Sequence, residues 1–238
     1  MSSDKPRYSL CIIVLPPLEA FFFLHSLKMN RVNFYFDGFN FYNGLKERTI
    51  NHPEWKNYYW IDFVKFCNQF IPAGELIEVK YFTATPSDDS QRSRQSALLK
   101  ANEILNPDKF ITIKGNYQSK SITCKKCNKI FNHPEEKRTD VNIAVNMMLD
   151  CFHDKADTFV LISADSDQVP TLQAIKQNFP SKNIKVYFPP NRKSFDLLSI
   201  FNQVVYLENN EDKFMKSVMP GEVIVGEKKY TRPLKWKY

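Results

Sequence analysis

The sequence predicts an α/β fold with a mostly parallel central sheet and helices on both of its faces. Short β-prone segments alternate with longer segments of helical periodicity through most of the 238 residues. Residues 158–163 (TFVLIS) are almost entirely apolar, which is typical of a strand in the middle of a parallel sheet. Acidic residues directly follow two predicted strands, and ligands of such sheets bind at the carboxyl ends of the strands. We therefore expect right-handed βαβ crossovers around one sheet.

Each element follows from a local pattern. Residues 32–36 (VNFYF) are β-prone and end at Asp37-Gly38, which indicates the first strand. Pro170 is acceptable in the first turn of a helix over residues 169–177. The predicted strands cover residues 32–36, 77–83, 110–117, 158–163, 184–188 and 204–207. The predicted helices cover residues 39–48, 61–70, 87–105, 139–152, 169–177 and 195–201.

The helix over residues 139–152 has apolar side chains at helical spacing, and we expect this stripe to pack against the sheet. The stripe consists of Val141, Ala144, Val145, Met148 and Phe152. The chain before this helix, over about residues 118–135, is rich in lysine and lacks a clear period, so we expect an irregular basic insertion there.

The domain organisation that we expect is an α/β core at residues 29–208, an extension at 1–28 and a basic tail at 209–238. Residues 10–27 are apolar, but Pro16, Pro17 and Glu19 interrupt them, which disfavours a membrane span. We expect a loosely attached extension and no membrane association; a signal peptide or an anchor is the alternative.

Composition narrows the class of protein. Lys and Arg outnumber Asp and Glu by 33 to 26, so the formal charge is +7, which favours phosphate-rich partners. Apolar residues make up 43 %, which excludes a wholly disordered chain. The five cysteines are odd in number and irregularly spaced, which argues against a secreted disulfide framework and for the cytoplasm.

Four aspartates fall where a metal site would need them. Asp37 follows the first strand, Asp165 and Asp167 follow the strand at 158–163, and Asp140 begins a helix. Each of them alone can be explained as a helix cap or a turn residue. Four carboxylates at one edge of the sheet would repel one another unless a cation lay among them, and hard oxygen ligands suit Mg²⁺ or Mn²⁺.

These residues lie in segments that resemble a known family. VNFYFDGFNFYNGL, EKRTDVNIAVNMMLD and TFVLISADSDQVPTLQAIK, in this order, are similar to motifs of the NYN domain in the PIN-like nuclease superfamily, in particular its LabA-like branch. The resemblance covers about residues 31–207 and implies a Rossmann-like PIN fold and metal-dependent ribonuclease activity on single-stranded or structured RNA. The site residues that it implies are Asp37, Asn40, Asp140, Asp165 and Asp167. One departure is Gln168, where the family often has a bulky apolar residue.

Activity of this kind would use the ion to activate water and to neutralise the scissile phosphate. We expect Asp37, Asp140, Asp165 and Asp167 to bind it, Asn40 to orient a ligand or the attacking water, and products with 5′-phosphate ends. A non-catalytic RNA-binding or regulatory adaptor of the same fold is the alternative, and a homo-oligomer stays open. Other acid-centred or nucleotide-binding enzymes are disfavoured, because the chain lacks a P-loop and the second acid of an Asp-x-Asp after the first strand.

Basic and aromatic residues outside the acid motifs are candidates for contacts with RNA. Lys137 and Arg138, just before Asp140, and Lys125 and Lys126 in the insertion are the expected phosphate contacts. Cys124 and Cys127 have the spacing of half a zinc knuckle, so zinc binding, a redox pair and free thiols all stay open. Further residues can either contact nucleic acid or serve the fold: Arg92, Arg94 and Lys100, Phe41 and Tyr42, Ser163 and Ser166, and Tyr230, Trp236 and Tyr238.

Overall fold

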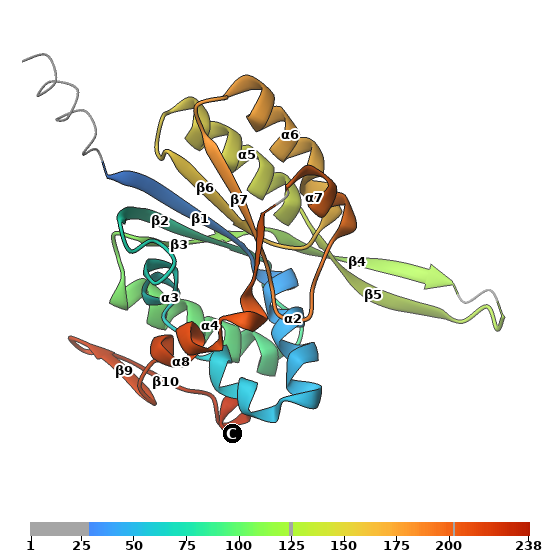
Figure 1. Ribbon diagram of the computed structural model, residues 1–238. Coiled ribbons are helices and arrows are strands. Elements are labelled where there is room, and N and C mark those ends of the chain that lie inside the picture. Colours follow the sequence, from blue (N-terminus) through green and yellow to red (C-terminus); the bar gives the residue numbers. More distant parts are fainter. Residues whose placement is uncertain (1–28, 124–125, 202) are drawn as a thin grey trace, which may run out of the picture.

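The computed structural model describes residues 29–123, 126–201 and 203–238 (Figure 1). Its strands are β1 Asn30–Asp37, β2 Gly74–Thr83, β3 Phe110–Lys114, β4 Asn116–Thr123, β5 Ile130–Lys137, β6 Thr158–Ile162, β7 Asn183–Phe188, β8 Val204–Tyr206, β9 Glu222–Val225 and β10 Lys228–Thr231. Its α-helices are α2 Gly38–Asn51, α3 Phe63–Asn68, α4 Asp89–Leu105, α5 Thr139–Phe152, α6 Val169–Asn178, α7 Phe195–Ile200 and α8 Glu211–Ser217.

Six strands form one parallel sheet in the order β3-β2-β1-β6-β7-β8, which confirms the predicted fold class. The chain fills one half of the sheet outward from β1 and then returns to build the other half outward from β6. The switch point therefore lies between β1 and β6, where doubly wound sheets bind ligands. Phe36 pairs with Ile162 across this junction, so Asp37 and Ser163 follow neighbouring strand ends.

Helices cover both faces of the sheet (Figure 1). Successive side chains of a strand point to opposite faces, so β1 contributes Phe34 and Phe36 to one core and Tyr35 to the other. The first core contains α2, α3, α4 and α8, and its aromatic rings pack edge-on and stacked, as between Phe36 and Phe63 at 5.0 Å. The second core contains α5, α6 and α7.

The segment between β3 and α5 differs from the prediction. It is not irregular: β4 and β5 pair antiparallel along their whole length, from Asn116 with Lys137 to Thr123 with Ile130. Figure 1 shows this hairpin extending away from the body of the protein. A two-stranded ribbon has two free edges, so Pro134 is accommodated although it has no N–H to donate.

The stripe predicted to pack α5 against the sheet is wrong in three of its five members, whereas Met148 is half-buried and packs against the second core. Val141, Val145 and Phe152 are exposed, at 63 %, 48 % and 72 %. The face packed on the sheet instead carries Ile143, Met147, Asp150 and Cys151.

A buried polar cluster explains why this face tolerates an acid. Asp150 accepts hydrogen bonds from Lys80 Nζ at 2.5 Å and Tyr35 Oη at 2.6 Å, so its charge is paired beneath α5. A buried acid without such partners would be strongly destabilising.

The segment expected to be a basic tail is folded onto the first core. α8 and the β9–β10 hairpin follow β8, and Phe214, Met219, Val223 and Trp236 are buried in that core. Trp60 Nε1 donates to the Pro220 carbonyl oxygen at 2.7 Å, which fixes the chain between α8 and β9. The ring of Trp236 stacks on Tyr59 with centroids 5.5 Å apart.

The extension at 1–28 lies outside the described residues, and its predicted character stays a prediction. Among the residues that are described, no helix combines the length and the apolar character needed to cross a membrane.

Candidate metal centre

Asp37 stands at the junction of β1 and α2, where strand passes directly into helix. Its carboxylate caps α2, because the Asn40 backbone N–H donates to Oδ1 at 3.0 Å. Ser163 Oγ donates to Oδ2 at 2.8 Å from the end of the neighbouring strand. Both oxygens keep a further lone pair, so the capping role does not prevent Asp37 from binding a cation.

Asp165 is held in the loop that follows β6. The buried Ser163 hydroxyl accepts from the Asp165 backbone N–H at 3.0 Å while it donates to Asp37, so one side chain links the two acids. Asn40 Oδ1 accepts from the Ala164 backbone N–H at 3.1 Å and ties this loop to α2. Asn40 was expected to orient a ligand or the attacking water. In the structure its side chain holds the loop that carries Asp165.

Asp140 reaches the same place from the opposite face of the sheet. It lies in the first turn of α5, where an acid complements the helix dipole. Gln168, buried in the turn after Asp165, donates through Nε2 to the Asp140 carbonyl oxygen at 3.4 Å. Its Oε1 is buried without a partner among the described groups. The sequence showed Gln168 only as a departure from a pattern, and its contact with Asp140 depends on the turn geometry.

Asp37, Asp140 and Asp165 form a three-carboxylate cluster. One oxygen from each lies within 4.8 Å of the others. This spacing suits joint coordination of a divalent ion, for which metal–oxygen lengths are about 2.0–2.6 Å.

Asp167 lies outside that group. It is exposed, and its backbone N–H donates to Asp165 Oδ1 at 3.0 Å. It is nevertheless near enough for its charge to raise the pKa of Asp140. The structure thus brings three of the four predicted acids together and leaves Asp167 at the rim.

The electrostatics of the cluster favour a cation. Burial raises the pKa of Asp37 to about 6, against the opposing effect of its two hydrogen bonds, and the charges of Asp140 and Asp165 add to the rise. The pKa of Asp140 is also raised, first by burial and then by Asp165 and Asp167. Carboxylates that repel one another in a partly buried place are stabilised by a hard divalent ion, and the all-oxygen donor set fits Mg²⁺ or Mn²⁺.

The predicted nucleic-acid contacts lie on the hairpin and at its base. Lys137 and Arg138 are exposed beside Asp140, and Arg138 takes a left-handed conformation (φ 75°) where β5 turns into α5. Lys126 is exposed at the end of the hairpin. Lys125 and Cys124 lie outside the described residues, and Cys127 is an exposed free thiol, so the zinc pair stays a prediction.

Fold and site together define a doubly wound α/β protein with an acidic centre at its switch point. Residues 31–208 match the NYN domain, and the chain belongs to this family of PIN-like nucleases. A search of curated proteins finds no match to the chain. Its structure is similar to the crystal structure of a protein of unknown function from Vibrio parahaemolyticus, with a TM-score of 0.50 and 19 % identity over 74 % of this chain and 92 % of that one. At this identity the likeness concerns the fold alone.

Proposed function

We propose that this protein is a metal-dependent ribonuclease that hydrolyses phosphodiester bonds of RNA at the Asp37–Asp140–Asp165 cluster. The observation that carries the proposal is the convergence of these three carboxylates, from three separate segments of an NYN domain, to within 4.8 Å. The formal charge of +7 supports a polyanionic substrate. Positive charge elsewhere on the protein attracts such a substrate and offsets its repulsion by the acid cluster.

Each residue has a definite part in this proposal. Asp37, Asp140 and Asp165 would hold Mg²⁺ or Mn²⁺, and Asp167 would contact it through water from the rim. The bound ion would supply an activated water and neutralise charge on the scissile phosphate. Ser163 and Asn40 act through other groups: the first holds the Asp37 carboxylate and the Asp165 backbone, and the second fixes the loop that carries Asp165. Lys137 and Arg138 would contact the RNA backbone.

The test is cleavage of fluorescein-labelled single-stranded RNA with Mn²⁺ by the wild type, Asp37→Asn and Asp165→Asn. The matched control is Asp108→Asn, an exposed acid in the turn before β3. Loss of a cation worth several kcal/mol to the transition state should lower cleavage by about 100-fold or more in the two cluster variants. Calorimetry should show Mn²⁺ binding by the wild type and the control.

Equal cleavage by all four proteins would refute the assignment, and so would the absence of Mn²⁺ binding by the wild type. Mn²⁺ and RNA binding without cleavage would replace the enzyme by an adaptor of the same fold.

A further inference from the structure

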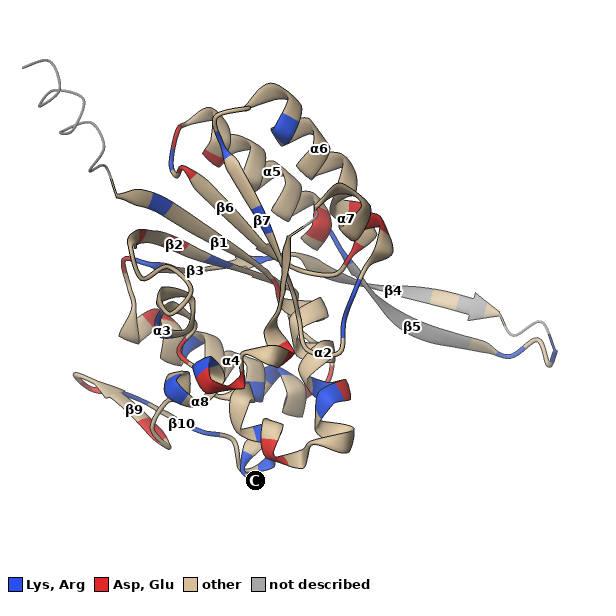
Figure 2. Cartoon of the chain, viewed as in Figure 1, with Lys and Arg blue, Asp and Glu red and all other residues tan. Residues whose placement is uncertain are grey.

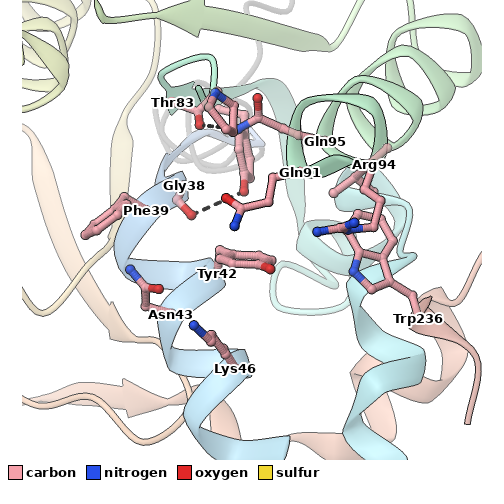
Figure 3. A pocket seen from close by; sticks show the side chains of 13 residues that line it. Gly38, Phe39, Tyr42, Asn43, Lys46, Thr83, Gln91, Arg94, Gln95 and Trp236 are labelled. Carbon is pink, nitrogen blue, oxygen red and sulfur yellow. Dashed lines mark hydrogen bonds between the residues drawn. The ribbon is translucent and has the colours of Figure 1, made fainter. Parts of the chain in front are cut away.

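A cavity of about 170 Å³ opens between α2 and α4, and Gly38, the residue after Asp37, is part of its lining (Figure 3). Tyr42, Asn43 and Lys46 enter it from α2, whereas Gln91, Arg94 and Gln95 enter it from α4. Figure 3 shows these two sets facing each other across the opening. A cavity of about 150 Å³ admits a benzene ring, so this one has room for a flat heterocycle of similar size.

Aromatic rings form one side of this cavity. Tyr42 is half-buried, and its ring packs on Tyr59 with centroids 5.3 Å apart. Tyr59 stacks in turn on Trp236, which also lines the cavity. The three rings support one another, so the face of Tyr42 is held in place rather than free to rotate. A fixed aromatic face is the feature on which unpaired bases stack.

The polar groups of the cavity have capacity left for a ligand. Gln95 Nε2 is engaged by Thr83 Oγ1 at 2.8 Å and the Ala84 carbonyl oxygen at 3.2 Å, which fixes the amide and leaves its Oε1 as an acceptor. No hydrogen bond is found for the Gln91 side-chain amide within the described part of the chain. Amides of this kind match the donor and acceptor edges of nucleobases.

Two positively charged side chains also line the cavity. Lys46 and Arg94 have no carboxylate partner among the described side chains, although Arg94 also donates to Ser90 on its own helix. A planar guanidinium can stack on a base or pair with a phosphate, and an ammonium attracts a phosphate. The cavity therefore combines a stacking face, base-edge partners and positive charge within one small space.

The cavity lies next to the acid cluster, because a residue that lines the cavity is bonded to a residue of the cluster. Gly38, which lines it, directly follows Asp37, so their Cα atoms are about 3.8 Å apart. Thr83, which also lines it, follows Phe82, the residue that pairs with Asp37 between β1 and β2. A strand of RNA with a phosphate at the acids would thus place a base at the cavity within about one nucleotide.

We propose that this cavity is a binding site for one unpaired nucleobase of the RNA, next to the phosphate that is cleaved. The inference rests on the proposed nuclease function, and it adds that the substrate is single-stranded at this point. A base in a duplex is stacked and paired, so it could not enter. Contacts with the backbone alone would not require the fixed aromatic row or the amides.

The experiment measures binding of short fluorescein-labelled single-stranded RNA by anisotropy in EDTA, so that cleavage does not intervene. A series of RNAs carries one abasic nucleotide, moved stepwise along the strand. Because stacking of a base on an aromatic ring gives about a 5- to 150-fold gain in affinity, one position should lose about tenfold or more when abasic. Mapped cleavage by the wild type with Mn²⁺ should lie within one nucleotide of it.

The variants Tyr42→Ala, Gln91→Ala and Arg94→Ala should bind intact RNA more weakly and lose most of the response to the abasic position. Lys100→Ala removes a positive charge from an exposed site on the same helix, outside this cavity, and should keep the full response. Gln91 is exposed, so its variant keeps the test valid if Tyr42→Ala does not fold.

No sensitive position, or a response unchanged in all three variants, would overturn the base site even if the protein cleaves RNA. A position-dependent response without any cleavage would retain the base site and remove the nuclease assignment instead. Equal affinity for a duplex of the same sequence would also contradict the inference.

Discussion

At the scale of single residues, Asp37 joins three structural roles in one carboxylate. It caps α2, receives the Ser163 hydroxyl and belongs to the acid cluster, although it is only 4 % exposed. Its elevated pKa of about 6 shows that the charged form is disfavoured by burial more than its hydrogen bonds favour it. The metal-free protein is therefore destabilised at the place where an ion would bind.

Asp37→Asn tests this. The pKa of about 6 in the folded protein lies above the ordinary value near 3.8, so ionised Asp37 lowers stability progressively between these pH values and fully above them. In EDTA at about pH 7.5 the variant should be more stable to heat than the wild type, by up to about 3 kcal/mol in the free energy of unfolding. This difference in stability should vanish at about pH 4. Thermal unfolding at the two pH values measures both.

With Mn²⁺ the wild type should become more stable than Asp37→Asn, because only the wild type gains stability from binding the ion. A variant that is less stable than the wild type in EDTA at neutral pH would contradict the account of Asp37.

The acid cluster could largely be predicted from the sequence. Asp37 and Asp165 follow strands whose carboxyl ends meet, and Asp140 begins the helix that packs beside them, so topology alone brings them together. Asp167 could not be placed in the same way, because the short 3₁₀ turn Ser166–Gln168 sets its direction. The cavity residues Lys46 and Gln91 carried no local signal, since an exposed polar residue on a helix usually faces only solvent.

At the scale of elements, the close contact between α2 and β2 fixes the geometry of the centre. A Cβ atom on Gly38 would lie 2.5 Å from the Phe82 carbonyl oxygen and 2.5 Å from Tyr81 Cε1. The oxygen belongs to the backbone of a central strand and cannot move away. Glycine is thus required for α2 to begin directly at the end of β1.

Gly38→Ala should displace the start of α2 and weaken Mn²⁺ binding, although no ligand is changed. Overpacking of this kind costs about 1–3 kcal/mol in stability. Gly221→Ala is the control, because a Cβ there meets nothing within 4 Å. Calorimetry with Mn²⁺ and chemical denaturation measure the two effects, and unchanged Mn²⁺ affinity in Gly38→Ala would show that the helix start does not position Asp37.

The β4–β5 hairpin leads to a separate prediction. Lys126 and Lys129 are exposed near its end, and Figure 2 shows positive charge there. Lys126→Gln with Lys129→Gln should weaken RNA binding at low salt and reduce the salt dependence, by about one unit of slope for each phosphate that is no longer neutralised. Binding titrations over a salt series measure this. Thermal stability and Mn²⁺ affinity should stay at wild-type values, and an unchanged slope would exclude the hairpin from the RNA path.

Element boundaries could be predicted where turn or capping residues mark them. The face of α5 that packs on the sheet could not be predicted. The helix is apolar on more than one side, since Val141 and Val145 compete with Ile143 and Met147 for the sheet. The buried side is marked by Asp150, whose partner Lys80 is distant in sequence. Periodicity counts apolar residues and cannot anticipate a buried acid that is paired from another strand.

At the scale of the whole molecule, the segment after β8 completes the first core. Phe214 is fully buried and packs on Phe66 at 4.5 Å between centroids, and on Trp55 at 5.2 Å. The positive charge of this segment suggested a tail, and its few apolar residues gave no period from which packing could be inferred. Their burial follows only from the aromatic surface that α3 and the turn Pro53–Tyr59 present.

Phe214→Ala should therefore destabilise the entire domain by about 3–5 kcal/mol, the usual cost of removing a buried phenylalanine. Met215→Ala is the matched control, since Met215 is 64 % exposed one position further on. Urea denaturation followed by fluorescence measures both. Equal midpoints would mean that the segment is attached without contributing to the core.

The direct passage of β1 into α2 has a consequence for the products. Asp37 and Gly38 border two sites with no loop between them, so the separation of the two sites is as rigid as the strand itself. An enzyme built in this way would cut the RNA at a fixed distance from the base that it binds. Sequencing of its fragments should reveal uniform termini at one constant offset from the captured nucleotide, whereas a ragged distribution would mean that recognition and scission are mechanically independent.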